Sequence, residues 1–374
     1  MEGTRRVAAL QSLRNRFARA APGSRATMFL IAAAAFASLT PTPSAWVERL
    51  YSTGTYLLGQ QVVTRLSSLV GFALLDLLAA VLALTLTVWW WRSIRRAPPG
   101  WRACGIAALH TAFRTLGVAA AIYLVFLTLW GLNYRREPLT AKLDYESTRI
   151  TSAALATLSG EAVSRLNRLH GEAAAVGDWP AFDEIPAWLG PAFDVVQRQL
   201  GLTPPAVPGR PKPTLFASYF RNAGVDAMMN PWGLEVLVND AVLPYERPFL
   251  VAHEWSHLAG YANEAEASFV GLLVCLAGDA RSRYSAWLYL TPRLVQHLPQ
   301  NTQAEIWAGL DDVPRAHLRA IAARFTRETT PIVQRSASVV YDRFLRANRV
   351  DAGVASYGLV VDLVLGTAGT DTWQ

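Results

Sequence analysis

The segment FLVAHEWSHLAG, residues 249–260, holds the side chains whose types and spacing are best suited to chemistry. In a helix, His253 and His257 are one turn apart on the same face, so two imidazole nitrogens can converge on one Zn²⁺ ion. Glu254 would lie beside the ion, where its carboxylate can take a proton from an activated water and pass it to a leaving amine. The alternative, a surface helix with two unrelated histidines, is disfavoured because residues 249–252 are apolar. The pattern predicts hydrolysis of peptide bonds.

A catalytic zinc site needs a third protein ligand and an open position for water. Gly260 permits a sharp turn after the histidines, and Asn263 can cap a second helix that begins at Glu264. Glu264 and Glu266 compete for the ligand role. Glu264 is favoured because Ser268 follows it by four positions on the same helix face, whereas Glu266 suits the third position of a capping box. We therefore predict Glu264 as the third ligand, with Glu266 and a more distant residue as alternatives.

The remaining histidines and two tyrosines are weaker candidates. Tyr284 and Tyr289 lie in the segment RYSAWLYL, and a phenol can stabilise a tetrahedral oxyanion. Aromatic residues at this density more often form core, which is the interpretation we favour. His170, His297 and His317 lie in helical, partly charged stretches and are interpreted as ordinary surface or core histidines.

Three apolar stretches precede the candidate site, at about residues 26–46, 69–91 and 104–132. Each can span a bilayer, which takes roughly 20 helical residues. Pro41 and Pro43 interrupt the first stretch, whose basic lead also fits a signal sequence. A hydrophobic content of 52% and a mean hydropathy of +0.20 agree with membrane segments. The sequence therefore predicts three N-terminal transmembrane helices.

The distribution of charge predicts the orientation of these spans. Residues 1–134 hold 13 Lys and Arg against three acids, whereas the rest of the chain holds 22 against 25. The arginines precede the first span and fill the loop between the second and third, so both regions should be cytoplasmic. The domain that follows the third span is then extracytoplasmic, in a multi-pass protein of the bacterial cytoplasmic (inner) membrane. Because the basic excess reflects topology, it does not support nucleic-acid binding.

Three ionisable residues, Asp76, His110 and Arg114, lie within or near the spans, where such groups are functional candidates by default. We favour snorkelling or helix pairing for all three. A transporter built around Asp76 is disfavoured because three spans offer few walls for a pathway. The two cysteines, Cys104 and Cys275, are too few for a disulfide framework or a Cys-rich metal site.

The rest of the chain has a globular composition. Helical patterns cover residues 151–175 and 187–200, and a Pro-rich link then leads to strand-like runs at residues 214–219 and 234–238. We predict an α+β, mainly helical fold. A membrane anchor of residues 1–134 would precede a zincin-like metallopeptidase domain of residues 135–374, whose active-site helix is bordered by a short sheet.

Four segments resemble an uncharacterised bacterial family of membrane-anchored HExxH proteins. They are WGLNYRREPL, HEWSHLAGYANEAEASF, YSAWLYL and YDRFLRANRVDAGVASYGLVVDLVL, and the resemblance runs from about residue 126 to residue 365. In that family three spans precede a gluzincin-like domain. The resemblance implies zinc ligation by His253, His257 and Glu264, with Glu254 as the catalytic base. Ser268 stands where the family usually has Asn. This difference puts in doubt a contact from position 268 to the metal site, but not the ligands. No substrate is implied.

The expected function is zinc-dependent hydrolysis of a peptide or protein substrate at the outer face of the cytoplasmic membrane. The protein would then have two partners, this substrate and the lipid bilayer, and would bind no nucleic acid. The alternative is a catalytically inactive zincin-like membrane sensor or scaffold. Glu254 argues against it, because a structural zinc site has no need of a base and usually closes its fourth position.

Overall fold

The computed structural model describes residues 22–368, which divide into two compact units. Residues 22–42 and 77–128 form the first, the apolar unit, and residues 43–76 and 129–368 form the second, the globular unit. The expected boundary at residues 134 and 135 differs from this division. Residues 43–76 precede two of the apolar helices in the chain, but they pack with the residues that follow those helices.

The apolar unit contains most of three helices: α2 (Pro22–Leu39), α5 (Leu74–Arg95) and α6 (Trp101–Leu129). Both α5 and α6 are long and apolar enough to cross a membrane, and a third span results if Gly23–Leu39 and Ser44–Ser68 count as one broken span. Trp90 Nε1 on α5 donates a hydrogen bond to Thr115 Oγ1 on α6, at 3.2 Å. Among the described residues, two or three helices are therefore compatible with membrane association.

The observed ends of these helices differ from the expected ends. α2 stops at Leu39, before Pro41 and Pro43, because proline lacks the N–H that a helix interior requires. α5 begins at Leu74 and not at residue 69, so Asp76 lies in its first turn and not deep in a span. α6 begins at Trp101, three residues before the expected start.

Residues 44–68 form a helical segment that belongs to the globular unit. It comprises α3 (Ser44–Trp46), a π-helical stretch η1 (Val47–Thr55) with non-helical backbone angles at Gly54, and α4 (Tyr56–Ser68). Polar side chains attach it to the rest of the unit. Gln60 Nε2 donates to the carbonyl of Val207, and Thr64 Oγ1 donates to the carbonyl of Leu234, each at 2.8 Å.

A small sheet lies beside the helices of the globular unit. It has the order β1 (Pro211–Lys212), β3 (Glu235–Val238), β2 (Ala227–Asn230), with β1 parallel and β2 antiparallel to β3. The strand expected at residues 234–238 is confirmed. The prediction of a strand at residues 214–219 is wrong, because the helix α9 (Ala217–Ala223) covers the second half of this range. Thr214 Oγ1 accepts a hydrogen bond from the Phe216 N–H, a local contact that favours a turn before the helix.

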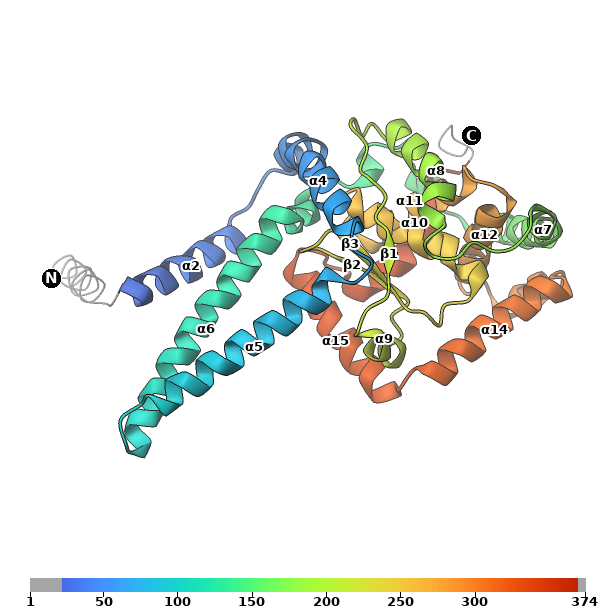
Figure 1. Ribbon diagram of the computed structural model, residues 1–374. Coiled ribbons are helices and arrows are strands. Elements are labelled where there is room, and N and C mark those ends of the chain that lie inside the picture. The colour runs from blue at the N-terminus through green and yellow to red at the C-terminus, as the bar shows by residue number, and fades with distance from the viewer. Residues whose placement is uncertain (1–21, 369–374) are drawn as a thin grey trace. The chain divides into compact units, whose positions relative to one another are not determined.

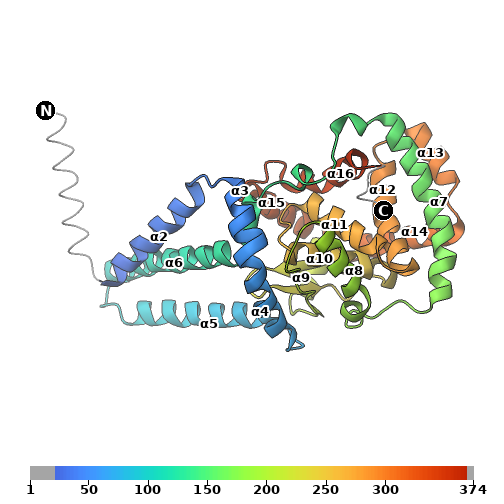
Figure 2. The ribbon, with the colours of Figure 1, turned by 90° about the horizontal axis from the view of Figure 1, so that it is seen from above.

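The core of the unit is built from packed helices (Figures 1 and 2). α10 (Arg247–Leu258) packs against α11 (Glu264–Leu276) and against β2 and β3. α12 (Ala280–Val295) packs on both helices, α7 (Ser152–Val176) packs on α12, and α8 (Ile185–Gln199) packs on α11. The helices expected at residues 151–175 and 187–200 are thus confirmed as α7 and α8.

Shorter elements complete the globular unit. The helices α13 (Gln300–Ala308), α14 (Asp312–Glu328), α15 (Pro331–Ala347) and α16 (Val360–Gly366) follow α12. The 3₁₀ turns are η2 (Gly131–Arg135), η3 (Leu139–Ala141), η4 (Ser147–Arg149), η5 (Pro244–Glu246) and η6 (Gly353–Leu359). η6 packs against both α15 and α11, so the C-terminal part of the chain reaches the helix that carries Glu264. The mainly helical prediction is confirmed.

Candidate metal centre

α10 holds both histidines in the buried centre of the globular unit. Pro248 lies in its first turn, where a missing N–H costs nothing, and the helix ends at Leu258. Gly260 follows with a φ of +86°, a left-handed conformation that favours glycine. His253 and His257 occupy consecutive turns, and their ring centroids are 4.7 Å apart. The HEWSH segment is therefore helical, as its pattern predicts.

α11 brings Glu264 to the histidines. The side chain of Asn263 accepts hydrogen bonds from two backbone N–H groups of the first turn, the closer at 2.9 Å, so Asn263 caps α11 as expected. Gly271 lies against the backbone of His253, where an added Cβ would be 3.0 Å from the His253 nitrogen. Glycine at this position allows α10 and α11 to approach closely enough for the three side chains to meet.

His253, His257 and Glu264 form one compact, buried cluster. The Nε2 atoms of both histidines are 3.3 Å from Glu264 Oε2, and one ligand atom from each residue lies within 4.8 Å of the other two. Among the described residues, no group forms a hydrogen bond of good geometry with Glu264 Oε2. A buried, unpartnered carboxylate oxygen between two imidazole nitrogens is the arrangement expected of groups that share a cation.

The charges of the cluster depend strongly on one another. Burial raises the pKa of Glu264, but the two histidines lower it more, so the pKa of this carboxyl lies well below its ordinary range. Burial lowers the pKa of His257, but the Glu264 carboxylate raises it more, to about 9. The environment therefore favours an anionic Glu264 with a positive charge beside it.

Each histidine has a partner for its Nδ1 atom. His257 Nδ1 is 2.7 Å from the carbonyl oxygen of Tyr261, which can only accept, so Nδ1 carries a hydrogen. The other ring nitrogen, Nε2, faces the cluster and has a lone pair when the ring is neutral. His253 Nδ1 is 3.2 Å from Ser268 Oγ, which accepts a hydrogen bond from Tyr289 Oη at 3.0 Å. Serine at position 268 thus keeps a contact to the cluster, through His253.

Glu254 points into the same buried region and is 4% exposed. Burial raises the pKa of its carboxyl group, the two histidines lower it, and the net shift is upward. The backbone N–H of Met229 on β2 also interacts with this carboxylate. Glu254 therefore lies between the cluster and the strand at the edge of the sheet, although no bond fixes it to the cluster.

Two tyrosines from the C-terminal helices hold Glu264 in place, and the spacing of residues in the sequence does not predict either role. The hydroxyl of Tyr341 on α15 donates a hydrogen bond to Glu264 Oε1, and the hydroxyl of Tyr357 on η6 also interacts with this carboxylate. Both lie within the C-terminal segment that resembles the HExxH family. This resemblance was the only feature of the sequence that could have indicated a role for them at the site. Burial raises the pKa of both phenols, so they remain hydrogen-bond donors.

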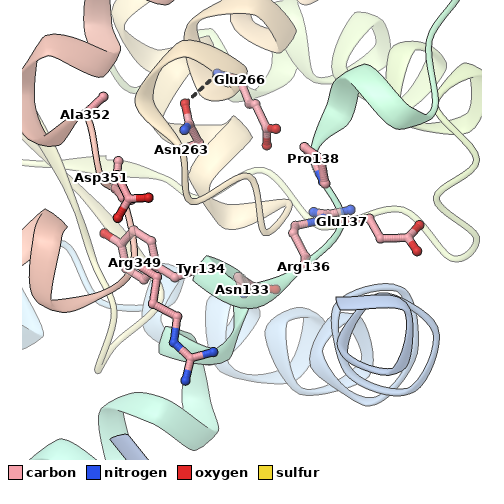
Figure 3. A pocket seen from close by; sticks show the side chains of 11 residues that line it. Asn133, Tyr134, Arg136, Glu137, Pro138, Asn263, Glu266, Arg349, Asp351 and Ala352 are labelled. Atoms are coloured by element: carbon pink, nitrogen blue, oxygen red, sulfur yellow. Dashed lines mark hydrogen bonds between the residues drawn. The ribbon is translucent and has the colours of Figure 1, made fainter. Parts of the chain in front are cut away.

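Glu266, the alternative third ligand, does not join the cluster. Its Oε1 accepts a hydrogen bond from the backbone N–H of Leu139 at 2.7 Å, and burial raises its pKa. It does not complete the expected capping box, because this contact replaces the bond back to the start of α11. Glu266 lines a cavity of about 190 Å³ (Figure 3), which has Asn263 on the same side and Arg136 across from it.

The other candidates have structural partners. Tyr284 is fully buried and its hydroxyl is 2.7 Å from His317 Nδ1, whereas Tyr289 stacks on Phe249. Asp76 accepts hydrogen bonds from the Thr214 hydroxyl and the Leu215 N–H, both at 2.7 Å. Its carboxylate therefore joins the first turn of α5 to the loop before α9. In the apolar unit, the guanidinium of Arg114 lies over the ring of Trp89.

Fold and site together define a mainly helical protein with apolar helices that are compatible with membrane association and with a buried His–His–Glu cluster. A model of the family described as "Protein of unknown function (DUF3810)" matches residues 51–365, and the chain therefore belongs to this family. No curated protein and no solved structure gives a significant match. The matched residues include most of the segment between α2 and α5, the cluster, and both tyrosines that hold Glu264.

Proposed function

We propose that this protein is a zinc-dependent peptidase of the bacterial cytoplasmic membrane, with its globular unit on the outer face. The observation that carries the proposal is the meeting of two Nε2 atoms at the unpartnered Oε2 of Glu264. Lone pairs that face one another in a buried space repel unless a proton or a cation lies between them.

The types of residue fit zinc. Two imidazoles and one carboxylate are the ligands of many catalytic zinc sites, whereas structural zinc sites have four protein ligands. The cluster contains three such residues among those described, His253, His257 and Glu264. When bound, Zn²⁺ would act as a Lewis acid toward the substrate carbonyl and would increase the acidity of water. Both histidines are already oriented by partners at Nδ1, which favours binding through Nε2.

Glu254 supplies the proton transfers in this proposal. It adjoins His253 in the HEWSH segment, it is buried, and the charges of both histidines and of Glu264 act on its pKa, so its carboxylate lies near the cluster. It accepts a proton from the attacking water and delivers this proton to the nitrogen of the leaving amine. A site that only bound a metal for stability would not need a buried carboxylate at this position.

The sheet favours an extended polypeptide as the substrate. β2 lies at the edge of the sheet, so one side of this strand has no neighbouring strand among the described residues. Met229, on β2, contacts the carboxylate of Glu254 through its N–H. An extended peptide that pairs with the free edge of β2 would therefore pass close to the proposed base.

The division into units supports the proposed topology. Residues 43–76 and 129–368 pack together, so they lie on the same side of any membrane. The chain between them must then cross an even number of times, which agrees with α5 and α6 as two spans. The arginine-rich loop between α5 and α6 places that loop in the cytoplasm and the globular unit outside.

The test uses the full chain in lipid nanodiscs, with zinc content measured by elemental analysis and hydrolysis measured on a mixture of quenched fluorescent peptides. Glu254→Gln should keep about one zinc per chain while hydrolysis falls by about two to four orders of magnitude, because the amide keeps the shape but cannot accept the proton. Glu264→Ala should lose zinc, because it removes a ligand.

Glu266→Ala is the matched control, since Glu266 is a buried glutamate of the same helical turn that lies outside the cluster. It should keep zinc. Full activity of Glu254→Gln would refute the assignment of the base. Loss of zinc from Glu266→Ala together with retention in Glu264→Ala would refute the ligand assignment. A parent protein that binds zinc but hydrolyses no peptide would favour the sensor or scaffold.

A further inference from the structure

The helical segment of residues 44–69 has its polar side chains inside and its apolar side chains outside. Gln60, Thr64 and Ser67 are at most 2% exposed, and each makes a hydrogen bond. On the other side lies what we term the outer stripe: Leu58, Val62, Leu66 and Leu69, with exposed fractions of 59%, 58%, 61% and 79%. A helix on a protein that faces water has the opposite arrangement.

The outer stripe is one continuous face. Its four residues follow one another at intervals of four, four and three positions, so they lie above one another along the helix. Trp46 and Leu50, 67% and 68% exposed, repeat the four-residue spacing in the first half of the segment, before the kink at Gly54. The apolar surface therefore extends along most of the segment.

The segment cannot turn this stripe inward, because its polar side chains are bonded to the globular unit. Gln60 bonds to Val207 through both its amide nitrogen and its amide oxygen. The carboxylate of Glu48 pairs with the buried guanidinium of Arg136 and with Lys142. Burial raises the pKa of Glu48, but these two cations lower it more, so the carboxylate stays charged. The apolar face thus needs an occupant from outside the unit.

The position of the segment in the chain indicates what covers its apolar face. The segment follows α2 and leads into α5, so both of its ends adjoin apolar helices. Leu215, 85% exposed, donates its N–H to Asp76 in the first turn of α5, so an exposed apolar residue also lies where α5 begins. The exposed Arg65 lies beside the outer stripe, as a cation does on helices that bind anionic lipid surfaces.

From this arrangement we infer that residues 44–69 lie in the plane of the bilayer surface, with the outer stripe among the lipid acyl chains and the polar face holding the globular unit. This inference takes α5 as a membrane span, but it does not depend on hydrolysis. It also concerns the metal cluster, because Tyr56 Oη on α4 donates a hydrogen bond to the carbonyl of Leu258, the last residue of α10, at 2.8 Å. The helix that carries both histidines is thereby bonded to the segment in the membrane surface.

The experiment places an environment-sensitive fluorophore on single cysteines of the full chain, with Cys104 replaced by serine and the buried Cys275 retained. Leu58→Cys and Leu66→Cys test the outer stripe. The control is Val176→Cys, 49% exposed at the end of α7, on the opposite side of the globular unit from α4 (Figure 2). The labelled proteins are reconstituted in nanodiscs of phosphatidylethanolamine and phosphatidylglycerol, and quenched either with iodide in water or with lipids that carry a spin label near the glycerol.

We expect labels at both stripe positions to have blue-shifted emission, to lose intensity with the spin-labelled lipids and to resist iodide. The label at Val176 should show the reverse. Iodide quenching at the stripe equal to that at Val176 would overturn the inference, because the face would then be in water. Protection from both quenchers would also overturn it, since a second protein surface would then cover the stripe. Because no outcome depends on zinc or on hydrolysis, this test and that of the proposed function can fail separately.

Discussion

Ser268 links the cluster to a second layer of side chains. Its hydroxyl contacts His253 Nδ1 and accepts a hydrogen bond from Tyr289. Because Nε2 of the same ring faces Glu264, a change at Nδ1 alters the direction and basicity of a proposed zinc ligand without removing it. The short side chain of Ser268 is long enough to span the gap between α11 and α10.

We predict that Ser268→Ala lowers zinc affinity by about tenfold to 100-fold, because the ring of His253 loses the partner that orients it. The measurement is a titration of the nanodisc-bound protein against a zinc chelator. Ser256→Ala is the control. Ser256 is equally buried, and it donates to the carbonyl of Ala252 on its own helix. An equal loss of affinity in both variants would show that the effect comes from general loosening of α10.

The residues with a fixed local spacing could be predicted from the sequence, and those without it could not. His253, Glu254 and His257 belong to one short pattern, and Asn263 and Glu264 follow at the start of the next helix. Tyr341 is 77 positions away from Glu264, so only the packing of α15 brings the two together. The pairing depends on tertiary structure, which single-sequence patterns do not contain.

At the scale of elements, strongly periodic helices were predictable and short strands were less so. β2, with the sequence AMMN, has no β-branched residue, and it forms a strand because it pairs with β3. The sequence suggests only a loop for residues 47–68. The alternation of polar and apolar residues there is consistent with a helix, but it does not reveal that the polar side faces the protein.

Glu235 on β3 connects three elements through one buried carboxylate. It pairs with the buried Lys212 on β1 at 2.7 Å and accepts the N–H groups of Leu74 and Leu75 at the start of α5. Burial raises its pKa, but these donors lower it more. A carboxyl group whose pKa is lowered by folding stabilises the protein above its ordinary pKa, and that contribution is lost as the pH falls through the lowered pKa.

We predict that Glu235→Gln destabilises the globular unit by about 3–5 kcal/mol, because it leaves the Lys212 ammonium buried without a counter-charge. Lys212→Met combined with Glu235→Gln should recover part of this loss. Thermal unfolding in nanodiscs, followed by circular dichroism from pH 6 to pH 3, is the measurement. The parent should lose stability toward low pH more steeply than the double variant, and equal slopes would contradict the role assigned to Glu235.

For the whole molecule, the proposed membrane topology rests on packing as well as on charge. The sequence predicts that the large domain is extracytoplasmic, because arginines gather in two regions that are expected to be cytoplasmic. Packing of residues 43–76 with residues 129–368 adds an independent constraint, because the two parts of one unit lie on one side. The sequence could not supply this constraint, since the contacts between Glu48 and Arg136 join residues 88 positions apart.

Reporter fusions at three positions test this arrangement. Fusions after Gly71 and after Asn133 should both be active with a reporter that works only outside the cytoplasm, and a fusion after Pro99 should be active only with a cytoplasmic reporter. The expected pattern is therefore outside, inside, outside along the chain. Opposite locations for Gly71 and Asn133 would contradict the packing of these two regions in one unit.

The interruption of the globular unit by α5 and α6 also sets an order of events during synthesis. Glu48 leaves the ribosome 88 residues before Arg136, a delay of roughly 4–18 s at ordinary rates of elongation. During this interval the polar face of the segment has none of its later partners, Val207 and Leu234 among them. If the outer stripe rests on the lipid surface, the bilayer holds this helix with its polar face turned toward the water until the rest of the unit arrives. The membrane would then serve as a template on which the two parts of the interrupted unit are assembled.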